Sequence, residues 1–322
     1  MAAPLAVPDA RGPEPARPEV ACPSTSSLPG WVDALVAGSP VVPVRGRGGR
    51  PDVRRRDVPG WRQISTAVPR VGLLDALTFQ QAVMDCFAAV LDQLDPLEAL
   101  HPVRFWAFVP EIHAQLEPDL DRYMVFNAAR FAAYSTWYGG RDAFSRTLAT
   151  ASAVGTQEEA FVLHCLAADT PGQPVENPRQ VPAYRYSRRF GPLPPCFARA
   201  TVVRPRAGGS LVMVGGTASI RGEESMHEDD LGRQVDETLA NLASVVSAAW
   251  GGAPGEAVAL ARYRHLRAYH RREADRATVE ARLKAAFPSI DRLELLSAEL
   301  CRAELLVEVE GLAEGPPSPA GR

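Results

Sequence analysis

Apolar residues in the first half of the chain recur at helical spacing in some segments and at strand spacing in others. Across residues 78–94 they follow helical spacing, and Thr78 with Gln81 forms a capping box that predicts where this helix begins. The short apolar run 104–109 ends at a proline and predicts a strand. A second helix is expected over 119–134.

The segment after the second helix contains turn residues and prolines. Gly139 and Gly140 close the helix, and residues 160–166 are another strand candidate. Residues 170–195 contain seven prolines, so we expect them to run over the surface or along the rim of a cleft.

The second half of the chain has a clearer pattern. Residues 200–204 and 210–214 are strand-like runs on either side of a Gly-Gly turn, and an apolar stripe over 231–250 predicts an amphipathic helix. The segments expected to follow are a strand at 256–270, a helix at 274–286, a strand at 290–300, a turn at 301–304 and a strand at 305–310. This ββαβαβ order predicts an α+β fold with a mixed sheet covered by helices on one face.

The pattern divides the chain into three parts. Residues 1–60 are rich in proline, glycine and arginine, which is typical of a flexible leader, although their basic cluster could also be a nucleic-acid arm. A first domain, including the proline-rich cleft loop, is expected over 61–195. A second domain is expected over 196–315.

The charge of the chain favours one interpretation of the leader. The 322 residues include 35 basic and 38 acidic residues, and the net charge of −3 favours a solvated leader over a nucleic-acid arm. Residues 1–20 contain prolines and acids where a signal peptide needs a continuous apolar stretch, and no run approaches the roughly 18 apolar residues of a membrane span. We therefore expect a cytoplasmic protein with neither a nucleic-acid nor a membrane partner.

The sequence contains none of the common metal and cofactor motifs. Its five cysteines include no CxxC pair, and its six histidines form no HExxH motif and no Cys/His quartet. A P-loop, a GxSxG motif and a GxGxxG motif after a predicted strand are also absent from the sequence. These patterns disfavour a metal site, a disulfide scaffold, phosphoryl transfer, serine hydrolysis and dinucleotide chemistry, and we expect no cofactor.

A proline-stiffened block, ENPRQVPAYRYSRRFGPLPPCFARA, gathers polar donors. They include Tyr184, Tyr186, Arg188 and Arg199. Arginine offers a planar fork that binds a carboxylate through two hydrogen bonds, so the block suits an anionic substrate. A solvated surface loop has the same composition, and the pattern alone leaves both interpretations open.

The last predicted strand contains two acids. Alternation places Glu308 and Glu310 on one face of the strand and apolar side chains on the other. Both acids could face solvent, or one could be functional. Cys301 lies at the turn before this strand, where it could equally be a small buried filler.

Several longer blocks resemble the chorismatase family, whose members cleave chorismate to 3-hydroxybenzoate or to a dihydroxycyclohexadienoate for secondary metabolism. The similar runs are RFWAFVPEI, RYMVFNAAR, the proline-stiffened block, GGTASIRGEESMHEDDLGRQVDETLANL and CRAELLVEVEG, in order from about residue 100 to about residue 312. The end of the chain also resembles the RidA/YjgF fold, which has the predicted ββαβαβ order. The resemblance implies two domains of this type, the first of them more divergent.

This resemblance implies a reaction and a set of site residues. Chorismate would bind in the cleft between the domains and lose its enolpyruvyl group as pyruvate, with Glu308 as the acid that protonates the enolpyruvyl methylene. Such an acid must be protonated near neutral pH, so we expect burial to raise its pKa. The residues expected to contact the carboxylates and hydroxyl of the substrate are Tyr184, Tyr186, Arg188 and Arg199, with Tyr134 and Arg141 from the earlier half.

Gly216 and Cys301 match the branch of the family that makes 3-hydroxybenzoate. In that branch the substrate's own 4-hydroxyl, rather than water, attacks the oxocarbenium, and an epoxide-like intermediate then opens and aromatises. Gly216 is expected to let the backbone approach the substrate ring. The alternatives are hydrolysis to 3,4-dihydroxycyclohexa-1,5-diene-carboxylate, an imine deaminase of the RidA type and a non-catalytic small-molecule binder.

Overall fold

The computed structural model describes residues 25–94, 100–252 and 255–317. The helices and strands of the first half are α1 (Gly30–Leu35), β1 (Val42–Val44), β2 (Val53–Val58), β3 (Trp61–Val68), α2 (Ala76–Leu91), β4 (His101–Pro110), β5 (Gln115–Glu117), β6 (Leu120–Asp121), α3 (Arg122–Tyr138), α4 (Phe144–Thr147), β7 (Thr150–Thr156) and β8 (Phe161–Ala168). Those of the second half are β9 (Gln173–Val175), β10 (Ala200–Val203), β11 (Leu211–Ala218), β12 (Ile220–Arg221), β13 (Glu224–Ser225), α5 (Leu231–Ala249), α6 (Glu256–Leu260), β14 (Tyr263–His270), α7 (Arg276–Ala286), β15 (Arg292–Ser297) and β16 (Val307–Glu314).

An aspartate caps the start of each of the long helices α2, α3 and α5. Asp75, Asp121 and Asp230 each accept a hydrogen bond from the backbone amide three residues later. Helix α2 therefore begins before Thr78, and the predicted capping box with Gln81 is wrong, because the Thr78 amide donates to Asp75 instead. The cap at Asp121 likewise places the start of α3 later than predicted.

The two halves of the chain repeat one sheet topology. The first sheet has the strand order β1-β2-β3-β8-β4-β7, and the second has β9-β10-β11-β16-β14-β15. In each sheet the last two strands are parallel and the other neighbouring pairs are antiparallel. The α+β fold with two similar domains and mixed sheets is confirmed.

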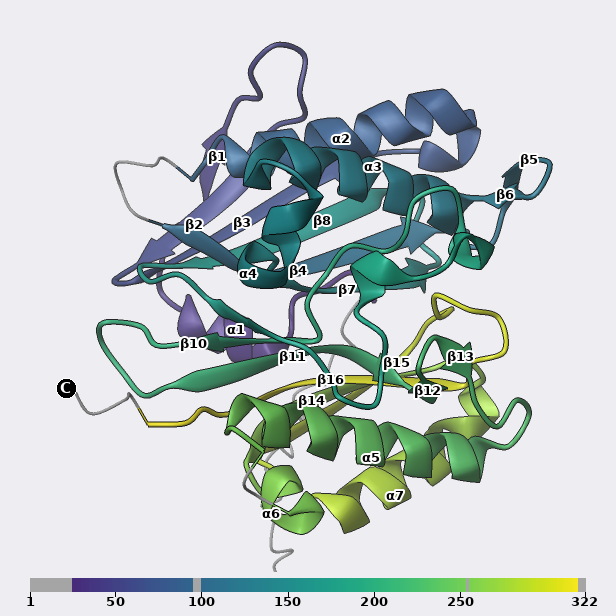
Figure 1. The fold of residues 1–322 in the computed structure, drawn as a ribbon. Coiled ribbons are helices and arrows are strands. Elements are labelled where there is room, and N and C mark those ends of the chain that lie inside the picture. Colours follow the sequence, from purple (N-terminus) through teal and green to yellow (C-terminus); the bar gives the residue numbers. More distant parts are fainter. Residues whose placement is uncertain (1–24, 95–99, 253–254, 318–322) are drawn as a thin grey trace, which may run out of the picture.

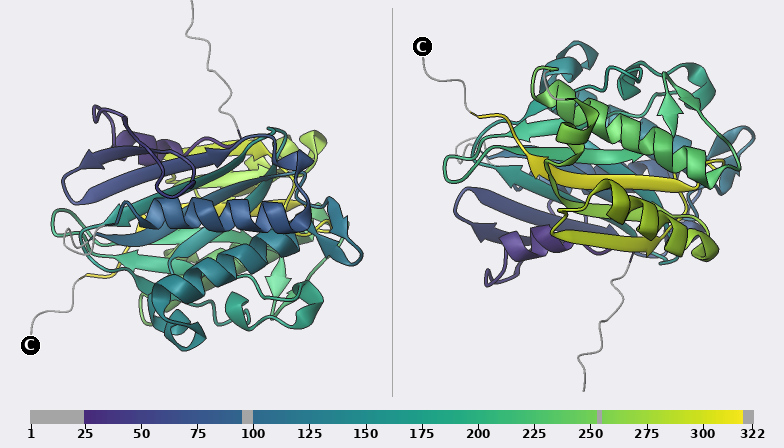
Figure 2. Two further views of the ribbon diagram at one scale, coloured as in Figure 1. Left: turned by 90° about the horizontal axis from the view of Figure 1, so that it is seen from above. Right: turned by 90° about the horizontal axis from the view of Figure 1, so that it is seen from below.

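Helices cover one face of each sheet, and the other faces are turned toward each other (Figure 1). Helices α2 and α3 lie side by side on the outer face of the first sheet, and α5 and α7 lie on the outer face of the second (Figure 2). The result is a four-layer arrangement of helices, sheet, sheet and helices. Among the described residues, no helix has the length and apolar character needed to cross a membrane.

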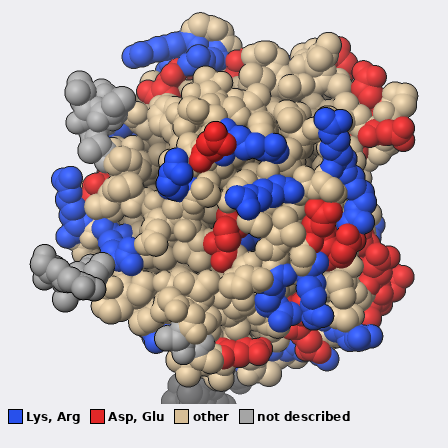
Figure 3. Space-filling view, viewed as in Figure 1, with Lys and Arg blue, Asp and Glu red and all other residues tan. Residues whose placement is uncertain are grey.

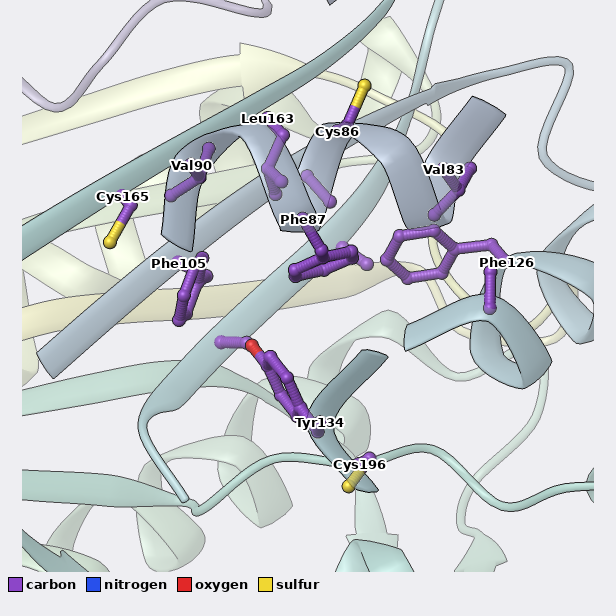
Figure 4. Close-up of a cluster of buried hydrophobic side chains, with 14 of the residues drawn as sticks. Val83, Cys86, Phe87, Val90, Phe105, Phe126, Tyr134, Leu163, Cys165 and Cys196 are labelled. Atoms are coloured by element: carbon purple, nitrogen blue, oxygen red, sulfur yellow. The ribbon is translucent and has the colours of Figure 1, made fainter. Parts of the chain in front are cut away.

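The core of the first half lies between α2, α3 and the first sheet (Figure 4). The ring of Phe87 on α2 packs against Phe105 of β4 at 5.7 Å and against Tyr134 of α3 at 5.3 Å between centroids. Cys86 and Cys165 are buried in this cluster as free thiols, so they act as small apolar side chains. An equivalent core lies between α5 and the second sheet.

A third apolar cluster joins the two sheets. It takes Trp106 and Phe108 from β4, Met213 from β11 and Tyr269 from β14, together with Val32 of α1. All five side chains are buried. Because both sheets contribute to this cluster, neither half buries its inner face without the other.

The element boundaries differ from the predicted domain limits. Strands β1 and β2 fall within the expected leader, and β2 pairs with β3 along its whole length from Val53, which is buried. The earlier part of that leader, residues 1–24, lies outside the described residues. Strand β9 falls within the expected first domain but pairs with β10 in the second sheet.

Residues 256–260 are also assigned differently from the prediction, because they form helix α6 rather than the start of a strand. Alanine has the highest helix propensity, and Ala259 and Leu260 turn inward to the core beside α5. The strand that was predicted from residue 256 therefore begins only at Tyr263.

Candidate functional site

A cavity of about 280 Å³ lies where segments of both halves meet. Its first-half walls come from α3 and β7, and its second-half walls come from β11, β16, the proline-stiffened block and the turn 301–304. On the face of the molecule seen in Figure 3, basic and acidic side chains are intermingled, without a broad patch of one sign. Surface charge on this face therefore marks no binding site, and the candidates for one are the side chains that line the cavity.

Glu308 extends from the middle of the second sheet into this cavity. Strand β16 lies between β11 and β14, where Glu308 is opposite Ala218 on one side and Tyr269 on the other. Its side chain is 4% exposed. A carboxyl group at this position is withdrawn from bulk water but faces the space that a ligand would fill.

Gly216 makes room for the Glu308 carboxyl. The pairing of β11 with β16 shifts register between Val214 and Thr217, which forms a bulge around Gly216. A Cβ atom at this position would lie 1.9 Å from Oε1 and 2.7 Å from Cδ of Glu308. The absence of a side chain at Gly216 therefore leaves room for the acid, and the glycine itself lines the cavity.

The surroundings of Glu308 favour its protonated form. Burial raises its pKa to about 8, and the negative charge of Glu310 acts in the same direction, whereas Arg104 and Arg199 lower it. Near neutral pH the carboxyl is consequently protonated for most of the time. Glu308 and Glu310 are both buried, so the possibility that both acids face solvent, which the strand pattern left open, is wrong.

Cys301 lies beside the acid at the start of the turn 301–304. Its Sγ is 4.0 Å from Oε2 of Glu308. Burial raises the pKa of this thiol to about 12, and the neighbouring Glu308 adds to the effect. Cys301 is thus a neutral thiol in contact with the carboxyl group, and both line the cavity.

Arginines also line the cavity. Arg199 donates hydrogen bonds to the Tyr186 hydroxyl at 2.6 Å and to the Val181 carbonyl at 3.1 Å. Arg130 on α3 donates to Asn127 at 2.8 Å. The ring of Phe197 contacts both guanidinium groups, which lie 5.1 and 5.3 Å from its centroid.

The cavity rim is formed by short surface segments that hold one another. Arg302 lies over the ring of Phe190 at 4.0 Å and donates to Ser225 on β13 at 3.0 Å. Ser225 in turn donates to Glu304 at 2.6 Å. Arg189 pairs with Glu224, an exposed ion pair at 2.6 Å.

The structure places some of the predicted site residues at the cavity and others outside it. Those that line it are Glu308, Cys301, Gly216, Tyr186 and Arg199. Tyr134 lies instead in the core of the first half, because α3 turns its ring toward Phe87 and Phe105.

Tyr184, Arg188 and Arg141 border a separate surface depression. Arg141 donates to the Tyr184 carbonyl at 3.3 Å, and the Tyr184 ring packs on Phe144. These contacts fasten the segment that carries Tyr186. The structure therefore places these three residues behind the site rather than in it.

Other cavity residues escaped the sequence analysis. Arg130, Tyr123, Ser152 and Phe197 line the cavity. A signal for Arg130 was available, because a charged residue four positions after Phe126 falls on the apolar face of α3. Ser152, in the buried strand β7, offers no comparable signal.

A metal centre finds no support in the part of the chain that is described. Residues 25–94, 100–252 and 255–317 contain no group of three or more His, Cys, Asp or Glu side chains arranged to hold an ion. Arginine, tyrosine, thiol and protonated carboxyl groups line the cavity instead. This set can bind an anion and supply a proton.

The chain is similar to known proteins along most of its length. Residues 55–167 match the family described as chorismatase FkbO/Hyg5-like, N-terminal. A 3-hydroxybenzoate synthase of Streptomyces hygroscopicus is 32% identical over 242 residues, which cover 73% of this chain and 69% of that protein. A chorismatase of Streptomyces rapamycinicus is 30% identical over 230 residues, 70% of this chain and 68% of that protein. A crystal structure of a chorismatase matches with a TM-score of 0.70 and 27% identity, over 85% of this chain and 80% of that chain.

Proposed function

The chain belongs to the chorismatase family, and from this premise we propose that it cleaves chorismate to 3-hydroxybenzoate and pyruvate. The observation that carries the proposal is the Glu308 carboxyl, which is protonated near neutral pH and lies in a cavity that also contains arginines. The names of the relatives support the same reaction class.

Glu308 acts as the general acid in this proposal. Cleavage begins when a proton is added to the enolpyruvyl methylene carbon, which leaves an oxocarbenium ion at the neighbouring carbon. An acid with a pKa of about 8 is protonated at pH 7 and still releases its proton readily. The carboxylate that results is stabilised by the positive charge of Arg104 and Arg199.

The arginines bind the two carboxylates of chorismate. Arg130 and Arg199 flank Phe197 and bind one carboxylate between them, while Arg302 at the rim binds the other. The Tyr186 hydroxyl accepts a hydrogen bond from Arg199, so its own proton remains available for a substrate oxygen. These contacts orient the methylene carbon toward Glu308.

The ring product follows from the exclusion of water. In a closed cavity the 4-hydroxyl oxygen of chorismate attacks ring carbon 3, and the electrons of the breaking C3–O bond complete the carbonyl of pyruvate. The proton of the 4-hydroxyl returns to Glu308, and an epoxide remains on the ring. Opening of its C4–O bond leaves a cation at C4, and loss of the C3 proton then makes the ring aromatic as 3-hydroxybenzoate, so no water is consumed. The neutral thiol of Cys301 supports this route as a small, weakly polar wall beside the acid.

We assign a supporting role to the predicted residues outside the cavity. Tyr184 and Arg141 fix the segment that carries Tyr186, and Arg188 belongs to the same surface depression. Their replacement is expected to affect Tyr186 indirectly, by loosening this segment.

Incubation of the purified chain with chorismate tests the proposed function. A coupled lactate dehydrogenase assay measures pyruvate, and chromatography identifies the ring product. Equal amounts of pyruvate and 3-hydroxybenzoate are expected. Pyruvate with the non-aromatic dihydroxy acid would assign the hydrolase reaction instead, and absence of pyruvate would refute cleavage altogether.

A further inference from the structure

Glu310 is the centre of a buried polar network that joins the two sheets. Its Oε2 accepts a hydrogen bond from Arg104 on β4 at 2.7 Å, and its Oε1 accepts one from Trp106 at 3.0 Å. The Tyr269 hydroxyl donates to the same Oε1 at 3.5 Å. Glu310 and Arg104 are each 2% exposed, so this ion pair is withdrawn from solvent.

Ser152 connects this network to the bulge at Gly216, next to the Glu308 carboxyl. Its Oγ donates to Oε2 of Glu310 at 2.5 Å and accepts a hydrogen bond from Arg104 at 2.6 Å. The backbone amide of Gly216 also donates to Ser152 Oγ, at 2.9 Å. Glu310 is therefore linked through one hydroxyl to the bulge on which the Glu308 carboxyl rests.

The two acids also interact through their charges. They are two residues apart on one strand, so their side chains share the face that is turned toward the first sheet. A fixed negative charge at Glu310 disfavours ionisation of Glu308.

Charged and titratable groups face Glu308 from each element around it. They are Arg104 from β4, Arg199 from the end of the proline-stiffened block, Tyr269 from β14, Tyr123 from α3, Cys301 from the turn and Glu310 from β16 itself. Arg104 and Arg199 favour the ionised carboxylate. Glu310 opposes this effect, because it lies directly on Arg104 and compensates its charge.

We propose that Glu310 is a positioning residue that, with Arg104 and Ser152, keeps Glu308 protonated and holds its carboxyl above Gly216. The inference rests on the proposed role of Glu308 as the acid. A buried ion pair adds little net stability compared with a well-packed apolar pair, so stability alone gives no reason for charges at this position. The network instead supplies a negative charge near Glu308 and a hydrogen bond to the Gly216 bulge beside its carboxyl.

Glu310→Gln tests this proposal by removing the charge while keeping the shape. Activity requires protonated Glu308, so in the wild type it declines as the pH rises through about 8. Positions two apart on a strand are separated by about 7 Å, and two like charges at about that distance in a partly screened interior shift a pKa by about one to two units. In the variant, kcat is expected to decline at a pH at least about one unit below that of the wild type, and KM is expected to change little.

Two further variants separate this effect from damage to the fold. Arg104→Met combined with Glu310→Gln leaves no uncompensated charge, and its pH profile should return most of the way to that of the wild type. Glu314→Gln is the matched control, because Glu314 lies on the same strand and pairs with Arg264 at the surface. Its pH profile should equal that of the wild type.

Infrared spectroscopy gives a readout that needs no turnover. The carbonyl band of protonated Glu308 is identified as the band that disappears in Glu308→Gln. This comparison distinguishes it from the band of Glu176, a second carboxyl group whose pKa burial raises to about 7. The pH at which this band disappears should fall in Glu310→Gln. An unchanged midpoint in both the band and the kcat profile would overturn the inference. A wild type that releases no pyruvate would refute the proposed function, while the band would still report on the network.

Discussion

Gly216→Ala tests the close fit between the bulge and the acid. The new methyl group would lie 1.9 Å from Oε1 of Glu308, whereas non-bonded heavy atoms approach to about 3.5 Å. The carboxyl group must therefore move by about 1.5 Å. The backbone itself need not change, because φ of Gly216 is not in the left-handed region.

This displacement is expected to reduce catalysis much more than stability. A misplacement of about 1 Å can cost about 10²-fold in rate, which corresponds to about 2.7 kcal/mol of transition-state stabilisation. We expect kcat for pyruvate release to fall by about 10²-fold and KM to change little, since the arginines are untouched. The melting temperature should fall by only a few degrees, because the atoms that must give way are the end of a flexible side chain.

Pyruvate release and thermal unfolding, measured on the same preparations, decide this prediction. Gly209→Ala is the matched control, because a Cβ there meets no atom within 4 Å and should leave both quantities unchanged. Full kcat in a folded Gly216→Ala protein would show either that Glu308 is seated elsewhere or that it does not deliver the proton.

The remaining predictions concern the acid, the anion site, the product and metals. Glu308→Gln should lower pyruvate release by about 10²-fold or more. It should also raise the melting temperature increasingly as the pH rises above 4.5, levelling off at about pH 8, because over this range unfolding lets the wild-type carboxyl ionise. Arg199→Lys should raise KM at least as much as it lowers kcat, since lysine lacks the planar fork. Combining Gly216→Ala with Cys301→Ala should divert the remaining turnover toward the dihydroxy acid, which chromatography detects. Dialysis against a strong chelator should leave kcat unchanged, and a loss restored by one divalent ion would contradict a metal-free site.

Where local signals agree, the sequence predicts the fold closely. Helix α5 was predicted over 231–250 and spans Leu231–Ala249, since its apolar stripe, its aspartate cap and the glycines after it indicate the same limits. Strands β1 and β2 were missed because they are short or rich in arginine. The arginines of β2 are accommodated by pairing with acids, as Arg55 does with Asp57.

The site could be predicted only in part, since most of its geometry depends on contacts between distant segments. Resemblance identified Glu308, Cys301 and Gly216, and all three line one cavity. It did not reveal that Glu310 is buried, because the countercharge on Arg104 comes from a strand 206 residues earlier in the chain. No local pattern in the sequence contains that pairing.

The face-to-face packing of the two sheets limits how a substrate can reach Glu308. A hinge opening of the halves would expose the third apolar cluster and separate Arg104 from Glu310, at a cost far beyond thermal energy. Entry and product release must then occur through the rim, whose segments are held by contacts such as the exposed Arg189–Glu224 pair, each worth about 1 kcal/mol or less. The molecule thus combines a cavity floor fixed by the packing of two sheets with a rim that weak surface contacts hold in place.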